Sequence, residues 1–259
     1  MKTINTYISE KLKIRKNKIK LGEEYTLFPE SKEELIQMIK DEMNKNGSKC
    51  SLNHISVSKI TDMTDLFYKS PLNLFNGDIS DWDVSNVNYM SNMFYHSDYT
   101  GKNGDISEWD VSNVKNMRYM FSYSAYCSDV SSWDVSNVEN MEGMFEGTKN
   151  FNSDLSVWDV SSVTNMAGMF DSSVFNNDIS NWEVSNVIDM SYMFCNNKVF
   201  NQTISNWNVS AVKDMNKMFC ATKVFNQDIS KWKIKNNCET DEMFVGCYIE
   251  EKYKPKCLQ

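Results

Sequence analysis

Seven tryptophans recur at intervals of 24 to 27 residues, and this repeat constrains the fold more than any other feature of the chain. They are Trp82, Trp109, Trp133, Trp158, Trp182, Trp207 and Trp232. Each lies in one context, typified by DISDWDVSNVNYMSNMF at 78–94, and a copy without Trp precedes them at 55–67. A unit of about 25 residues cannot bury its own apolar row, so neighbouring units must stack to share a core. We therefore predict a tandem array of about eight coils over residues 51–247.

Within one unit, the apolar spacing predicts two kinds of local structure. Residues 79–84 carry apolar side chains at spacings of 3 and 2, which places Trp82 and Val84 on one face of a short strand. Residues 87–93 carry an apolar side chain at every third position, which fits a 3₁₀ or single α turn. The predicted fold is a repeat solenoid of leucine-rich-repeat type, with one short parallel strand and one such turn per coil.

The repeated Trp and Met residues are the predicted core. Their alternative role, an aromatic stripe that binds a ligand, is disfavoured because they fall where the repeat must point inward. Met suits the irregular gaps between coils because its side chain is flexible. The predicted core comprises the seven Trp residues with Met93, Met120, Met144, Met169, Met193 and Met218.

The regions flanking the array divide into three segments. Residues 1–22 form a basic N-terminal segment, residues 23–50 a helical N-cap, and residues 248–259 a C-terminal tail. Ser31 and Glu34 form a capping box, and Gly47 provides a stop, so we expect a helix over 31–46 that covers the first coil.

Charge is unevenly distributed between these segments. Residues 1–22 hold seven basic residues and one acid, whereas the whole chain has a net charge of −8. The acidic body should repel nucleic acid and anionic membranes. No apolar run is long enough for a transmembrane helix or a signal peptide. We expect a monomer without a cofactor or a metal, in the cytoplasm or associated with a virion.

Acidic residues flank the Trp positions and are the candidate binding residues. Carboxylates stacked at strand spacing repel one another by about 1 kcal/mol per pair even in water. Either hydrogen bonds from the following turn or a cationic partner would offset this repulsion. The candidates are Asp81, Asp83, Glu108, Asp110, Asp134, Asp159 and Glu183. A second acid column is interpreted as turn chemistry because Ser follows two residues later, as in Asp78-Ile-Ser80.

Cys195 and Cys220 lie 25 residues apart at matching positions of adjacent units. They should therefore stack near each other. A disulfide is geometrically possible, and two packed thiols are the preferred reading.

The motif DIS-x-W-DVSNV-xx-M-xx-MF resembles that of the BspA-like leucine-rich-repeat surface proteins, including the Mycoplasma-type lipoprotein repeats of about 25 residues. Seven full copies over roughly residues 51–247 carry this resemblance. It implies a leucine-rich-repeat-like fold with a binding or adhesion role, a surface location and no catalysis. This chain differs from exported members because it shows neither a signal peptide nor a lipobox.

The favoured function is a non-enzymatic protein-interaction or adhesion module that acts through the concave strand face and the variable loops. The loops at 95–105 and 122–130 diverge most, because Lys102-Asn103 and Tyr126-Cys127 replace the usual Phe-Asn closure of the coil. Residues 1–10 also resemble the capsid-targeting peptides of T-even-like phages, with cleavage expected after Glu10. The second hypothesis is thus a packaged phage protein, and a carboxylate-dependent glycan hydrolase is the third.

Overall fold

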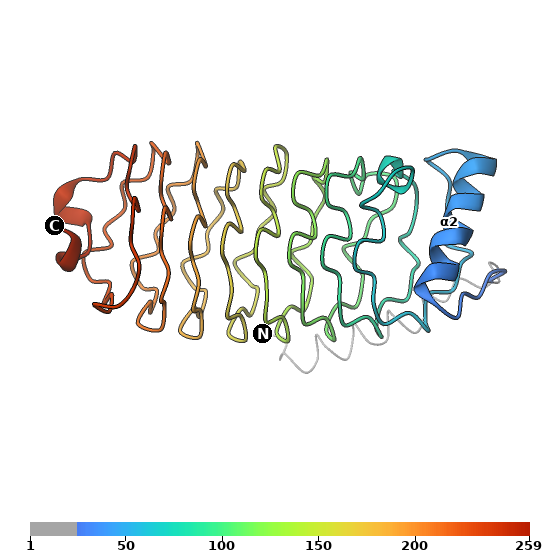
Figure 1. The fold of residues 1–259 in the computed structure, drawn as a ribbon, viewed down its shortest axis with the longest axis horizontal. Helices are drawn as coiled ribbons and strands as arrows, with labels where there is room; N and C mark the ends of the chain where they lie inside the picture. Colours follow the sequence, from blue (N-terminus) through green and yellow to red (C-terminus); the bar gives the residue numbers. More distant parts are fainter. Residues whose placement is uncertain (1–24) are drawn as a thin grey trace, which may run out of the picture.

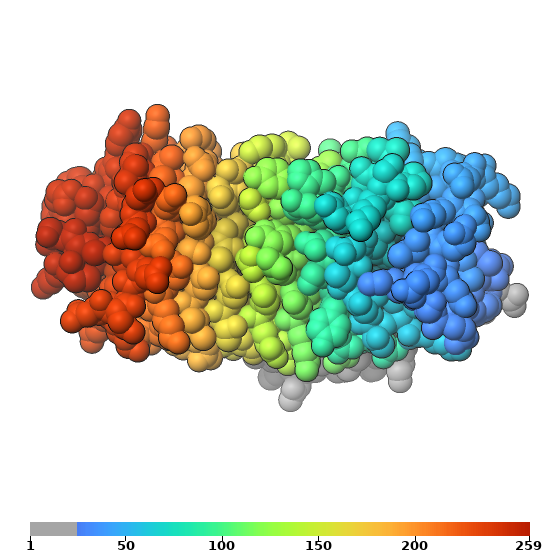
Figure 2. All heavy atoms as spheres, viewed as in Figure 1, coloured from blue at the N-terminus to red at the C-terminus, as the bar shows by residue number. Residues whose placement is uncertain are grey.

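The computed structural model describes residues 25–259 of this chain. The described elements are one α-helix, α2 (Lys32–Asn46), and three short 3₁₀ helices, η1 (Leu72–Leu74), η2 (Glu251–Tyr253) and η3 (Lys256–Leu258). The repeats lie side by side along one long axis, with α2 at one end and η2 and η3 at the other (Figure 1). Side chains fill the space between neighbouring repeats, so the surface is continuous (Figure 2). The predicted phage-type cleavage site and basic segment lie outside the described residues.

Helix α2 begins and ends where the sequence signals predict. The Ser31 side chain accepts a hydrogen bond from the Glu34 N–H at 3.2 Å. Gly47 ends the helix with a φ of 83°, and its N–H donates to the Met43 carbonyl. The buried face of the helix consists of Leu35, Ile39 and Met43. These side chains pack on the common core and close the first end of the stack.

The predicted leucine-rich-repeat-like solenoid with a strand in every coil is wrong, because the described residues contain no strand and no sheet. The predicted strand segment instead forms consecutive turns, in which Trp82 N–H donates to the Ile79 carbonyl at 3.2 Å. Neighbouring repeats share only isolated parallel bridges, one per repeat along most of the array, at positions such as Asn116 and Asn140. The concave strand face proposed for binding therefore does not exist.

The Asp and Ser residues of the motif explain why no strand forms. The Asp83 carboxylate accepts hydrogen bonds from both the N–H and the hydroxyl of Ser85, at 3.1 and 2.6 Å. This local bond uses the N–H that a strand would donate to its neighbour. The apolar side chains that recur at every third position of residues 87–93 also lie on turns, since the Met93 N–H donates to the Met90 carbonyl at 3.2 Å. Among the described residues, the predicted 3₁₀ or α turn of each coil is therefore a hydrogen-bonded turn and not a helix.

Aromatic side chains stack from one repeat to the next. We call each repeat a coil and name it after the residue at its Trp position, from the Ile55 coil to the Trp232 coil. The Phe that follows the second Met of each coil forms a column of parallel rings, as in Phe94 and Phe121, whose centroids lie 5.5 Å apart. The seven Trp residues are at most 5% exposed, and the predicted core Met residues are fully buried. The core assignment is therefore confirmed.

Each Trp also carries a hydrogen bond between coils. The Trp109 indole N–H donates to the Ile79 carbonyl of the preceding coil at 3.1 Å, and all seven Trp residues make the equivalent bond. The Ile79 carbonyl thus accepts two hydrogen bonds, one from the Trp82 N–H of its own turn and one from the indole of the next coil. Burial of a Trp side chain removes on the order of 200 Å² from water, or about 5 kcal/mol before entropy is counted.

A row of backbone N–H groups runs along the Met–Phe side of every coil. In the Trp82 coil the N–H groups of Met90, Asn92, Phe94 and His96 donate to carbonyls of the Trp109 coil. We call these four alternating donors the forward row. The second and fourth donors have positive φ, 54° at Asn92 and 52° at His96. This backbone conformation recurs along the array and aims alternate N–H groups in one direction.

Candidate functional site

The candidate acidic residues lie on the surface beside the buried Trp residues. Asp83 and Asp134 are exposed, and each accepts hydrogen bonds from the Ser two residues later. Asp159 makes the same turn, and hydrogen bonds from Ser161 lower the pKa of its carboxyl. The expected turn hydrogen bonds are therefore present in the column after Trp, and each of these three carboxylates has a fixed direction.

From the Trp82 coil to the Trp207 coil the side chain at this position accepts a hydrogen bond from the following turn, and this bond does not require a charge. Asn208 occupies the same place in the Trp207 coil and accepts from the Ser210 hydroxyl at 2.8 Å. In the Trp232 coil the position is Lys233, which has no carboxylate at all. The five acidic members lie in the consecutive coils from Trp82 to Trp182. The turn hydrogen bonds alone do not require a carboxylate in five successive coils.

An open hollow of about 320 Å³ lies beside the first two of these acidic coils. It brings together residues of both acid columns, including two that the sequence suggested were purely turn formers. Asp81 and Glu108 were candidate binding residues, whereas Asp78 and Asp105 were assigned to turns. The lining residues are Asp78, Ser80, Asp81, Lys102, Asn103, Gly104, Asp105 and Glu108.

Residues 100–105 build one wall of the hollow. The Thr100 N–H and hydroxyl both donate to the Asn76 side chain, and Asn103 donates to the Asn76 carbonyl at 2.6 Å. Gly104 fits closely against the preceding coil, because a Cβ at this position would lie 2.6 Å from a carboxylate oxygen of Asp78. Four carboxylates and one lysine ammonium thus line the same opening, which suits a ligand rich in cationic or hydroxyl groups.

The predicted replacement of the Phe-Asn closure by Lys102-Asn103 is wrong. Tyr99 occupies the aromatic position, is fully buried, and stacks on Phe75 with ring centroids 6.1 Å apart. Its hydroxyl donates to the Gly104 carbonyl at 2.7 Å and so ties the wall of the hollow to the core. Burial raises the pKa of Tyr99 well above its ordinary value, which keeps this hydroxyl a donor. Lys102 and Asn103 belong to a segment added after the closure.

The second divergent loop is anchored in the same way. Tyr126 takes the aromatic position, as expected, and lies 6.1 Å from Phe151 in the next coil. It is fully buried, and its hydroxyl donates to the Asp129 carbonyl at 3.3 Å. The half-buried Cys127 follows it without a disulfide.

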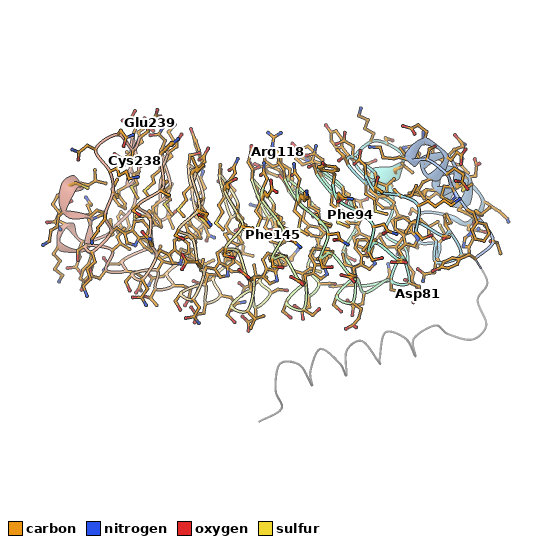
Figure 3. All side chains as sticks on the ribbon, turned by 90° about the horizontal axis from the view of Figure 1, so that it is seen from below. Asp81, Phe94, Arg118, Phe145, Cys238 and Glu239 are labelled. Atoms are coloured by element: carbon orange, nitrogen blue, oxygen red, sulfur yellow. The ribbon has the colours of Figure 1, made fainter. Side chains whose placement is uncertain are left out.

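The opposite side of the stack carries an interlock that the sequence analysis missed. Figure 3 places Asp81 on one long side and Arg118 on the other, with Phe94 and Phe145 between them. The Tyr119 ring lies where a side chain on Gly143 would stand, 2.0 Å from an added Cβ, and its hydroxyl donates to Glu142. Arg118 pairs with the same carboxylate at 2.8 Å.

A second tyrosine repeats this arrangement four residues later. Tyr123 covers Gly147, whose added Cβ would lie 2.5 Å from the ring, and its hydroxyl donates to Glu146 at 3.1 Å. The visible signal was the pair of aligned segments RYMFSY at 118–123 and EGMFEG at 142–147. Tyrosine stands opposite glycine at both positions, with a glutamate before each glycine.

The cysteines are unbridged. All seven lie in the described part of the chain, and none forms a disulfide. Cys195 is buried and Cys220 is half-buried, as expected for packed thiols. Burial, with Asp171 and Cys220 nearby, raises the pKa of Cys195 to about 12.

Within residues 25–259, no cluster of three or more His, Cys, Asp or Glu side chains has the arrangement of a metal site. None of the helices described has the length and apolar character needed to cross a membrane.

Comparison with known proteins gives one match. The comparisons with curated proteins and with solved structures found no match. A family model described as "Mycoplasma protein of unknown function, DUF285" matches residues 34–155, 123–197 and 152–253. These overlapping matches include the Trp repeats and most of α2, and they establish a Mycoplasma-type tandem-repeat family. The chain therefore belongs to the DUF285 family.

Proposed function

We propose that this protein is a non-enzymatic interaction module that binds a basic or hydroxyl-rich partner through its acidic N-terminal coils. The observation that carries this proposal is the hollow lined by Asp78, Asp81, Asp105 and Glu108, with Lys102 in its wall. The acid column beyond the hollow, from Asp83 to Glu183, extends this surface over five coils. Adhesion to a cell surface is the form of this function that the BspA-like resemblance implies.

The surplus charge supports binding over a purely structural role. Asn208 makes the same turn without a charge, so five acidic residues in succession add repulsion that the turn does not need. A basic partner would remove this repulsion on binding and would be steered toward the surface over long range. The identical setting of these carboxylates also argues against a hydrolase, because no pair is distinguished as acid and nucleophile.

The test removes carboxylate charge from this acidic surface while keeping the hydrogen-bonded turns. The variant Asp81→Asn/Asp83→Asn/Glu108→Gln removes two carboxylates of the hollow and one of the acid column, and the amide at position 83 keeps an acceptor for Ser85, as Asn208 does for Ser210. Binding of the full chain to an oligolysine peptide and to a panel of neutral glycans is measured by titration calorimetry. We expect saturable binding of one probe, weakened at least tenfold in the variant and weakened by added salt.

The matched control is Asp154→Asn/Asp178→Asn/Asp228→Asn, which removes three carboxylates from Asp-x-Ser turns outside the hollow. This control should bind nearly as well as the unaltered protein. If binding were weakened equally in both triple variants, the loss would depend on net charge alone, and the proposed site would be overturned. Release of glycan fragments that stops on loss of a single carboxylate would instead establish the hydrolase.

A further inference from the structure

The forward row of the last coil has no partner. In the Trp207 coil the row is complete, and its last two members, Phe219 and Ala221, donate to the Met243 and Val245 carbonyls. In the Trp232 coil the corresponding donors are the N–H groups of Thr240, Glu242, Phe244 and Gly246. No residue in the described part of the chain accepts a hydrogen bond from any of these four groups.

This open row already has the conformation of the paired rows. Glu242 has a φ of 55° and Gly246 a φ of 71°, matching the left-handed residues of the preceding coils. The intervening N–H groups are satisfied, since Met243 donates to the Thr240 carbonyl and Val245 to the Glu242 carbonyl. Glu242, Val245 and Gly246 are exposed. A partner would therefore meet a preorganised edge and would incur little ordering cost on this side.

The chemistry of the edge defines what can pair with it. The row offers donors, and within the stack its carbonyls at Thr240, Glu242 and Phe244 are already used by the turns of the same coil. A partner must therefore present a row of carbonyl oxygens, as an extended polypeptide does in strand addition. Two copies cannot pair edge to edge, because donors would face donors. Head-to-tail pairing is blocked because α2 covers the other end.

The charges at this edge further restrict which polypeptide segments can bind there. Glu239, Asp241 and Glu242 are exposed on this coil and stand beside the open donors. Lys217 forms an ion pair with Glu242 at 3.3 Å, and Asn216 donates to Glu239. Asp241 makes no ion pair with any described residue. Lys254 lies over the Phe244 ring, 5.6 Å from its centroid, but it is paired with Glu251, which leaves Asp241 as the charge that would repel an acidic segment and attract a basic one.

We propose that the C-terminal end of the stack is a docking edge for an extended basic segment of another polypeptide, which adds its carbonyl row to the N–H groups of Thr240, Glu242, Phe244 and Gly246. This site is independent of the acidic hollow, which lies in the first coils of the array. The partner would take the place of a further coil.

The protein itself supplies a matched pair of probes. A peptide of residues 115–124, KNMRYMFSYS, is basic, and in the fold its carbonyls accept the forward row of the Trp82 coil. A peptide of residues 139–148, ENMEGMFEGT, accepts the next forward row in the same register but carries three glutamates. Both peptides share the Met-x-x-Met-Phe pattern, and they differ in charge and in having two tyrosines where the acidic peptide has two glycines. A reversed preference on changing the charge of the edge therefore isolates the contribution of charge.

The experiment measures binding of each peptide to the full chain, together with amide hydrogen exchange. We expect the basic peptide to bind at least tenfold more tightly than the acidic one. The four open N–H groups should gain protection, while the already bonded N–H groups of Met243 and Val245 should change little. The variant Asp241→Lys/Glu242→Lys should reverse the preference between the two peptides.

Three results would overturn the proposal. Absence of binding by both peptides would show that the edge is closed to strand addition. Protection that appears at the acidic hollow and not at 240–246 would assign the binding to the proposed function instead. The Asp81→Asn/Asp83→Asn/Glu108→Gln variant separates these cases, because it alters the hollow and should still bind the basic peptide at the edge unchanged. A concentration-dependent dimer that protects 240–246 would identify a second copy as the occupant.

Discussion

At the N-terminal end of the stack, α2 lays Leu35, Ile39 and Met43 over the core, and the Lys32 ammonium donates to the Thr64 carbonyl at 3.1 Å. At the C-terminal end, the residues that follow the last coil form only two short 3₁₀ helices, and four backbone donors face outward. The first end is sealed by a helix with matched polar contacts, whereas the second keeps the backbone conformation of an interior coil with its forward row unpaired. Repeat arrays need caps because each coil buries one face of its neighbour and the terminal coils lack a neighbour on one side. The difference shows that the stack is capped more completely at its N-terminal end than at its C-terminal end.

The largest expected effect comes from weakening the sealed end. Ile39 is fully buried beneath α2, so Ile39→Ala should lower the free energy of unfolding by about 3 kcal/mol. At the other end, Leu258 is only half-buried, and Leu258→Ala should cost less than about 1 kcal/mol. Urea unfolding followed by Trp fluorescence measures both values. Equal losses would contradict the claim that the two ends differ in their caps.

A smaller effect distinguishes an interlocked coil from the open one. Gly143→Ala combines a left-handed φ of 58° with a clash against the Tyr119 ring, so it should cost about 2 kcal/mol. In Gly246→Ala the added Cβ would lie no closer than 3.5 Å to any atom. The cost should therefore come only from holding alanine in a left-handed conformation, about 1 kcal/mol.

Gly168→Ala is the control for this pair, because its φ is 60° and no atom lies within 4 Å of the added Cβ. Thermal unfolding of the three variants should place Gly168→Ala with Gly246→Ala. A Gly143→Ala variant as stable as these two would show that Tyr119 moves aside without loss.

The smallest expected effect is on the pH dependence of stability. It compares Asp62 and Asp214, which occupy equivalent bridge positions in two different coils. Burial opposes ionisation of Asp62, but hydrogen bonds from Thr64 and Lys32 outweigh it, so the pKa of this carboxyl is lowered. Near the other end, burial and then the charges of Asp189, Glu239 and Asp241 raise the pKa of Asp214 against one hydrogen bond from Asn216.

The two shifts act on stability with opposite signs. The contribution of Asp62 is present above its unfolded pKa of about 3.9 and is lost as pH falls through the lower folded value. Asp214 instead lowers stability as pH rises from about 3.9 through its raised folded value. We expect Asp62→Asn to lower the melting temperature at pH 7 and Asp214→Asn to raise it. Shifts of the same sign, measured by scanning calorimetry at pH 3 and pH 7, would contradict this assignment.

The sequence predicts the repeat, the core and the helical cap because these depend on apolar periodicity and capping signals. Trp109 and Met120 are buried where their spacing requires, and Ser31 and Gly47 bound α2 as expected. The strand at 79–84 was wrong because the i,i+2 pair of Trp82 and Val84 is compatible with two backbone conformations. The Asp83–Ser85 hydrogen bond selects the turn, and spacing alone does not reveal which one forms.

The candidate site was only partly visible in the sequence. Asp81 and Glu108 were recognised from their place beside Trp, but Asp78 and Asp105 join them only because the added segment 100–105 folds against the preceding coil. Tyr99 holds that segment, and it follows Phe94 by five residues as Tyr126 follows Phe121, an offset that counting back from Trp109 does not reveal. Contacts between an inserted loop and a neighbouring coil depend on three-dimensional packing, which a repeat pattern does not specify.

The forward rows have an electrical consequence for the whole molecule. Along the Met–Phe side, the backbone N–H groups of each row point toward the C-terminal end, so their peptide dipoles add in one direction. This side of the stack should then resemble a helix macrodipole, with partial negative charge at the α2 end and partial positive charge at the last coil. Lys32 stands at the negative pole, and Glu239, Asp241 and Glu242 stand at the positive pole. The array is therefore a polarised rod whose two ends present different fields to any molecule that approaches them.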